Sequence, residues 1–257
     1  MPLQGHLSGM QPGRVGGILI VLAGIMFIMG FLFVNPDPRY STVSGLFILL
    51  LALPSFVVLI QWLGIRKGLF ILALFSLLPL LIEAVAVLTG IPYGRFSYSL
   101  AIGPVLFGLV PVTVAFAYLP VLLGGISLSC QGSGITLPRA VLLSTGFVLL
   151  ADLVIDPAAV HAGFWIWENP GLYYGIPLSN FIGWALTGFF YSWLFLILTS
   201  KPGKTLSFPP PMMAASLLLI MALWSGYLFS NQLLIPAVLG LMYAILIGSF
   251  LYKRRES

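Results

Sequence analysis

The sequence is poor in charge, and this shortage limits what the chain can be. Only 7% of its 257 residues are charged, whereas 60% are hydrophobic. A soluble domain carries about 25% charged residues, so this composition cannot build a water-facing surface. The mean hydropathy of +1.11 agrees with that conclusion. Lipid must therefore cover most of the outside, and we expect an integral membrane protein of the cell membrane.

Cysteine and histidine are nearly missing as well. The one cysteine, Cys130, excludes a disulfide within the chain and any metal cluster built from cysteines. The two histidines, His6 and His161, are too few for a histidine-based metal site, and we expect His161 in a loop. No feature of the sequence calls for a cofactor, and none is expected.

Long apolar runs are what the sequence has in abundance. A helix needs about 20 mostly apolar residues to cross the hydrocarbon core. Eight segments approach or reach that length, so we expect an all-α polytopic bundle in one membrane domain over residues 1–257. The expected spans are Val15–Val34, Val43–Leu63, Leu69–Leu88, Val105–Leu123, Ala140–Ile155, Phe181–Thr199, Met212–Phe229 and Leu233–Tyr252. Only residues 230–232 separate the last two, and if these form a single span the count falls to seven.

The basic residues favour one orientation of this bundle. With eight spans, nine of them fall on one face and two, Arg39 and Arg95, on the other. Cytoplasmic loops are enriched in Lys and Arg, so both termini are expected in the cytoplasm. Basic loops of this kind are topology signals, and no nucleic-acid partner is expected. The nine residues are Arg14, Arg66, Lys67, Arg139, Lys201, Lys204, Lys253, Arg254 and Arg255.

The few acidic residues point to a site. Five of the six lie on or near the face opposite the basic loops, namely Asp37, Glu83, Asp152, Asp156 and Glu168. Glu83 and Asp152 fall inside apolar spans, where an ionisable group is costly and a functional role is the default reading. Asp156 precedes Pro157, which disfavours helix, so we expect the fifth helix to end there. A solvated helix end would account for Asp156 equally well.

Aromatic and polar side chains flank these carboxylates. The loops after the third and fifth spans carry Tyr93, Arg95, Tyr98, Trp165 and Trp167. Asn180 and Trp184 are four residues apart at the start of the sixth span and share a helix face. Each ring taken alone fits the interfacial belt of membrane proteins, and Arg95 fits a salt-bridge partner for the carboxylates. Together they indicate a mouth near the outer interface.

Four stretches in this region resemble the membrane-bound carotenoid hydratases, a family that includes carotenoid 1′,2′-hydratases and C50 carotenoid 2″,3″-hydratases (bisanhydrobacterioruberin hydratases). They are E-A-V-A-V-L-T-G-I-P-Y-G-R-F-S-Y (Glu83–Tyr98), D-L-V-I-D-P (Asp152–Pro157), W-I-W-E (Trp165–Glu168) and G-L-Y-Y-G-I-P-L-S-N-F-I-G-W (Gly171–Trp184). The best-matched region is residues 83–184, about spans three to six.

The resemblance implies that water is added to the terminal double bond of an acyclic carotenoid, giving a tertiary alcohol. Its implied partners are the carotenoid, water, the lipid bilayer and other enzymes of carotenoid biosynthesis. The residues suit this chemistry independently, because a carboxylic acid kept neutral by apolar surroundings protonates an alkene and aromatic faces stabilise the cation.

We assign the catalytic carboxylates accordingly. Glu83 is the expected proton donor, because it is the deeper of the two and apolar residues flank it on both sides. Asp152 is expected to orient or deprotonate water, with Asp156 one turn away, and the reversed assignment stays open. The expected substrate-binding residues are Tyr93, Arg95, Tyr98, Trp165, Trp167, Asn180 and Trp184.

Two other classes stay open. Asp152-x-x-x-Asp156 resembles one half of the Asp-rich Mg²⁺–diphosphate site of intramembrane prenyltransferases, although the other half is missing. A transporter or a non-enzymatic carotenoid-binding or lipid-binding protein is the third class, although a transporter places its ionisable groups nearer the midplane. Dependence on Mg²⁺ would favour the transferase, and oxygen from water in the product would favour the hydratase.

Overall fold

A computed structural model describes residues 12–33, 37–131, 134–200 and 209–253. Within these ranges the chain forms eight α-helices, namely α1 Pro12–Phe33, α2 Ser41–Leu63, α3 Ile65–Thr89, α4 Val114–Ser129, α5 Leu137–His161, α6 Leu178–Thr199, α7 Ala215–Ser230 and α8 Leu234–Lys253. The strands are β1 Phe96–Tyr98, β2 Val105–Leu106, β3 Val110–Pro111 and β4 Trp165–Trp167. Three 3₁₀ turns complete the order, η1 Pro38–Tyr40, η2 Leu100–Ile102 and η3 Pro211–Ala214.

The expected all-α membrane bundle is confirmed. Seven helical segments in the described ranges are long and apolar enough to cross a membrane, with α7 counted together with η3 as Pro211–Ser230, and the remaining helix, α4, has 16 residues. The last two expected spans are the separate helices α7 and α8, so they do not merge into a single span. The expected span that falls short of the membrane thickness is the fourth one, which contains α4.

The bounds predicted for the fourth span, Val105–Leu123, are wrong. Residues 105–111 form the β2–β3 hairpin, in which Val105 pairs with Pro111. Gly108 adopts a φ of 69° in the turn of this hairpin, and Pro111 has no N–H to donate to a helix. The helix therefore begins only at Val114, and the apolar run before it lies across the end of the bundle.

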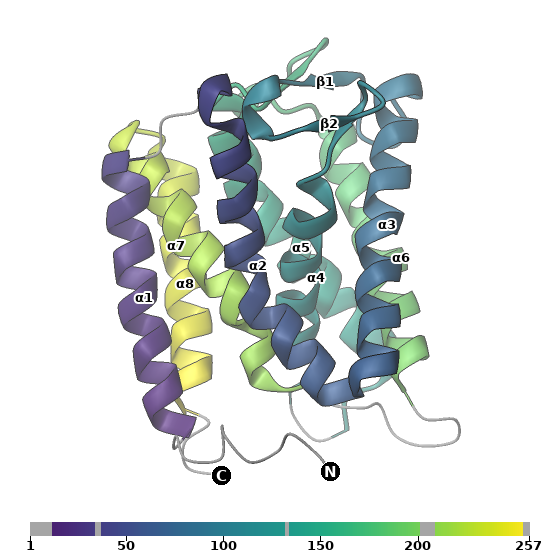
Figure 1. The fold of residues 1–257 in the computed structure, drawn as a ribbon, viewed down its shortest axis with the longest axis vertical. Coiled ribbons are helices and arrows are strands. Elements are labelled where there is room, and N and C mark those ends of the chain that lie inside the picture. Colours follow the sequence, from purple (N-terminus) through teal and green to yellow (C-terminus); the bar gives the residue numbers. More distant parts are fainter. Residues whose placement is uncertain (1–11, 34–36, 132–133, 201–208, 254–257) are drawn as a thin grey trace.

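The helices α1, α7 and α8 pack side by side, with α7 at the inner position (Figure 1). Glycines allow α1 and α7 to approach closely, because a Cβ on Gly30 would meet the Leu223 carbonyl and one on Gly226 would meet the Phe27 carbonyl. The beginning of α1 and the end of α8 lie at the same end of the bundle, opposite β1 and β2 (Figure 1).

A small sheet covers that opposite end. Strand β1 pairs with β4 in antiparallel register, Phe96 opposite Trp167 and Tyr98 opposite Trp165. The Trp167 indole N–H also donates to the carbonyl of Tyr93 at 3.1 Å. We call residues 90–113 and 162–177 the roof. The roof brings together the loops that follow α3, which carries Glu83, and α5, which carries Asp152 and Asp156.

Candidate active site

A cavity of about 440 Å³ lies beneath the roof. Helices α2, α4 and α7 supply most of its wall, and Tyr98 and Trp165 reach it from the roof. Among the described residues that line it, Glu83 is the one acidic residue, and most of the others are aliphatic or aromatic. An apolar ligand is therefore favoured, with a single carboxyl group at its side.

The cavity reaches the molecular surface at the beginning of α2. Tyr40 and Val43 belong to its lining, and they are 58% and 62% exposed. A ligand dissolved in the bilayer can enter from this side without crossing the polar end of the bundle.

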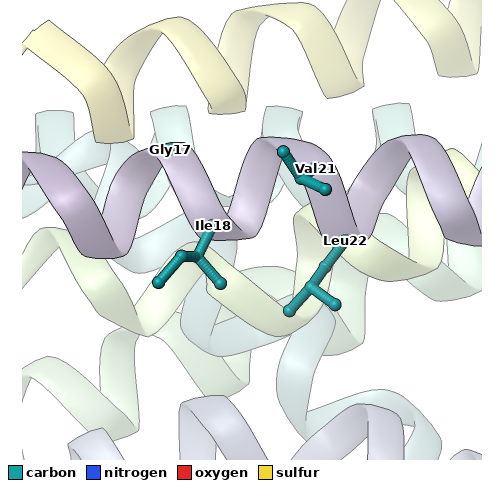
Figure 2. Close-up of a pocket in the computed structure, with 4 residues that line it drawn as sticks. All are labelled: Gly17, Ile18, Val21 and Leu22. Atoms are coloured by element: carbon teal, nitrogen blue, oxygen red, sulfur yellow. The ribbon is translucent and has the colours of Figure 1, made fainter.

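A second hollow lies on the outer flank of α1 (Figure 2). It is lined by Gly17 and by the exposed side chains of Ile18, Val21 and Leu22. Figure 2 shows no polar group among these four residues. A purely apolar flank of this kind belongs to the lipid-facing surface, so we place the site in the cavity beneath the roof.

Glu83 is held from the roof. It lies on α3 about one and a half turns before the helix ends at Thr89. The Tyr98 hydroxyl donates to Oε2 of Glu83 at 2.9 Å. Burial, and then the neighbouring Glu83, raise the pKa of Tyr98 well above its usual value. The phenol therefore keeps its proton and acts as a hydrogen-bond donor to one of the two Glu83 oxygens.

The two aspartates form a buried pair on α5. Asp152 and Asp156 are 0% and 1% exposed. The side-chain amide of Asn180, on α6, donates to Oδ2 of Asp156 in a short hydrogen bond and lies 3.5 Å from Oδ2 of Asp152. Glu83 interacts electrostatically with both aspartates. The carboxyl groups that the sequence singled out thus converge from two helices, α3 and α5, and α6 adds the amide of Asn180.

The cavity wall separates the aspartates from its interior. Neither Asp152 nor Asp156 belongs to the lining, whereas Ile155, which lies between them in the sequence, does. The described residues contain no group of three or more His, Cys, Asp or Glu placed to hold a metal ion. The placement of the aspartates therefore gives no support to a diphosphate-binding role.

The predicted end of the fifth helix at Asp156 is wrong. Helix α5 continues through Pro157 to His161. Pro157 cannot donate a backbone hydrogen bond to the carbonyl of Leu153, and the Tyr173 hydroxyl donates to that carbonyl instead, at 2.9 Å. Because the helix continues, Asp156 is buried rather than solvated.

The prediction that His161 lies in a loop is also wrong. His161 is the last residue of α5, and its Nδ1 is hydrogen-bonded to the Tyr227 hydroxyl of α7 at 2.9 Å. This contact joins the roof-side ends of the two helices and lies outside the cavity lining.

The predicted aromatic residues divide into two groups. Trp165, Trp184 and Tyr98 line the cavity. Tyr93 and Trp167 are buried in a separate cluster above it, where the Tyr93 hydroxyl donates to Thr187 at 3.2 Å. The first group can contact a ligand, and the second group fixes the roof to α6.

Arg95 does not reach the carboxylates. Its side chain is exposed at the roof. The ion pair found in the described part of the chain joins Asp37 and Arg39 at 2.6 Å, and the Arg39 side chain lowers the pKa of Asp37. The expectation that Arg95 forms a salt bridge with the acidic cluster is therefore wrong.

Sequence reasoning missed two tyrosines beside the site, Tyr118 and Tyr191. Tyr118 lines the cavity from α4, and its ring centroid lies 5.2 Å from that of Tyr191 on α6. Tyr191 was detectable, because it continues the helical spacing of Asn180, Trp184 and Thr187. Nothing in the apolar sequence around Tyr118 marks it.

Comparison with known proteins bears on this site directly. Residues 43–247 match the family described as "Carotenoid biosynthesis protein". The chain belongs to this family. The match includes both aspartates, Glu83 and the whole roof, and the family and the apolar helices agree on a multi-pass membrane protein.

One relative has a more specific description. Over 160 residues the chain is 39% identical to the bisanhydrobacterioruberin hydratase of Haloarcula japonica. The alignment covers 60% of this chain and 53% of that protein, so the chain matches about half the length of this curated relative. No solved structure matches the chain.

Proposed function

We propose that this protein is a membrane-embedded carotenoid hydratase, which adds water to the terminal double bond of an acyclic carotenoid end group. The observation that carries the proposal is Glu83, the one acid among the described lining residues, on the wall of a mostly apolar and aromatic cavity. The family and the hydratase activity named for the Haloarcula japonica relative support the same class of substrate and reaction.

The first step is protonation of the alkene. The Glu83 carboxyl proton forms a new C–H bond at the less substituted carbon, and a tertiary carbocation and the Glu83 carboxylate result. The faces of Trp165 and Trp184 stabilise this cation, because both rings line the cavity. Apolar surroundings favour the neutral, proton-donating form of the acid before the substrate binds.

Capture by water completes the reaction. A water oxygen forms the C–O bond to the cation, and the proton it loses passes to Asp152. Return of that proton from Asp152 to Glu83 restores the enzyme, so the sum is alkene plus water gives tertiary alcohol. Asn180 and Asp156 position Asp152, since the Asn180 amide bridges the two aspartates.

Expression in cells that make lycopene or a C50 precursor tests the proposal. The extracted carotenoid should gain the mass of one water for each hydrated end, and growth in heavy-oxygen water should place the label in the product. An unchanged carotenoid in both hosts, with the protein present in the membrane, would refute hydration of these substrates. Activity that requires Mg²⁺ and a prenyl diphosphate would favour the transferase class instead.

A further inference from the structure

Three buried oxygen atoms near the site have no hydrogen-bond partner among the described residues. They are Oδ1 of Asp152 and the hydroxyl oxygens of Tyr118 and Tyr191. Buried polar groups are almost always paired with protein atoms or with ordered water. The rings of Tyr118 and Tyr191 are neighbours, and Tyr118 interacts electrostatically with Asp152, so these three atoms indicate a place built to hold water.

Tyr118 connects this place to the cavity. Its ring lines the cavity from α4, with its centroid 5.2 Å from the centroids of both Trp184 and Tyr191. It interacts electrostatically with Asp152 and with Glu83. Tyr118 is thus part of the cavity wall and at the same time interacts with Asp152, which does not line the cavity.

One carboxylate oxygen of Asp152, Oδ1, is free to bind this water molecule. Its Oδ2 faces the amide of Asn180, which already donates a short hydrogen bond to Asp156. Its Oδ1 is buried and unpaired within the described part of the chain. A phenol and a carboxylate oxygen together supply two of the two to four polar contacts that a buried water needs.

We propose that Tyr118 and Oδ1 of Asp152 together hold the water molecule that attacks the carbocation, with the Tyr191 hydroxyl as a further contact. The inference rests on the proposed hydratase function and adds the residue that delivers water from the wall of the cavity. In the step it describes, the water oxygen bonds to the tertiary carbon and one water proton passes to Asp152. Tyr118 keeps its own proton and orients the water.

Separating protonation from water capture tests this role. Tyr118→Phe keeps the ring contacts and removes one buried hydroxyl, whose described neighbour, the Thr187 hydroxyl, lies outside ordinary hydrogen-bond geometry. In heavy water, Glu83 of this variant should still deliver a deuteron to the alkene. With no water in place, the cation loses a proton again, so recovered substrate carries deuterium while hydration falls about a hundredfold.

Two further variants make the comparison specific. Asp152→Asn alters the same water site and should also give deuterium exchange with little hydration, whereas Glu83→Gln should abolish both. Tyr243→Phe is the matched control, because Tyr243 is fully buried and its hydroxyl donates to the Phe147 carbonyl on the other side of α5. It should hydrate carotenoid at the wild-type rate.

The possible results test the water site and the hydratase function separately. Normal hydration by Tyr118→Phe would overturn the water site and leave the hydratase function standing. Loss of both exchange and hydration in Tyr118→Phe, with Tyr243→Phe active, would also overturn it, because protonation would then depend on Tyr118. Absence of any hydrate from the wild-type protein would instead refute the function.

Discussion

The Tyr173 hydroxyl donates a hydrogen bond of 2.9 Å to the backbone carbonyl of Leu153. Leu153 directly follows Asp152, and its carbonyl is the one that Pro157 leaves without a helical donor. Burial raises the pKa of Tyr173 to about 12, so at physiological pH the hydroxyl holds its proton and donates. A residue of the roof thereby completes the helix turn that carries both aspartates.

Replacing Tyr173 by Phe should weaken this turn. The variant leaves the Leu153 carbonyl unpaired, which costs about 1–3 kcal/mol, and the displaced aspartates should lower hydration as well. Thermal unfolding in detergent and product yield measure the two effects. Tyr174→Phe is the neighbouring control, and an equal loss in both variants would show that the contact to Leu153 is not the cause.

Glu83→Gln should reduce hydration by about two orders of magnitude or more. The amide preserves size and still accepts the hydrogen bond from Tyr98, but it cannot deliver the proton. The protein should still insert and bind carotenoid, and Asp152→Asn should lose activity less completely. Glu168→Gln, at an exposed acid of the roof, should change nothing. Near-normal hydration by Glu83→Gln would move the donor role to Asp152.

Asn180→Leu should be costly for both stability and activity. It removes the amide that faces both aspartates in a buried place, and unpaired buried acceptors cost about 1–3 kcal/mol each. Asn231→Leu provides the comparison, since the Asn231 amide donates to the Tyr227 carbonyl at 2.8 Å near the surface. Unfolding temperatures should fall clearly more for Asn180→Leu, and equal shifts would contradict the bridging role.

Gly183→Ala should disturb the attachment of the roof to α6. A Cβ at this position would collide with the ring of Tyr93, which packs directly against the helix backbone. Overpacking of this kind costs about 1–3 kcal/mol. Gly146→Ala is a matched helical control, because nothing lies within 4 Å of a Cβ there. We expect it to be neutral or slightly stabilising, and a similar loss in both variants would count against the steric argument.

The orientation in the membrane is also testable. The excess of basic residues that the sequence assigns to one face predicts that this face is cytoplasmic, although Lys201, Lys204, Arg254 and Arg255 lie outside the described residues. In intact cells, an impermeant thiol reagent should label Ser97→Cys in the roof and spare Ile65→Cys at the beginning of α3. Both side chains are exposed, and the natural Cys130 is buried. Labelling of Ile65→Cys from outside would reverse the orientation.

Hydrophobic length predicted most of the fold, because crossing a bilayer imposes a simple requirement on sequence. The same rule failed at Val105–Leu123, where an apolar run folds into a hairpin across the bundle end and only its second half is helical. The prediction that the helix ends at Asp156 failed at Pro157, because the carbonyl of Leu153 that this proline leaves without a donor is paired by Tyr173, which lies far along the sequence. The sequence does not single out Tyr118, because its place beside the site depends on contacts with Trp184 and Tyr191 of another helix.

The mouth of the cavity at Tyr40 and Val43 also determines how a two-ended substrate is handled. Under the proposed hydratase function, one end group would reach Glu83 while the remaining polyene stays among the lipid chains. Since Glu83 is the one acid among the described lining residues, a symmetrical carotenoid has to withdraw, turn end for end in the bilayer and return before its second end reacts. The proposal therefore predicts that the half-hydrated molecule is a free intermediate, and the ratio of singly to doubly hydrated product would report how often it comes back.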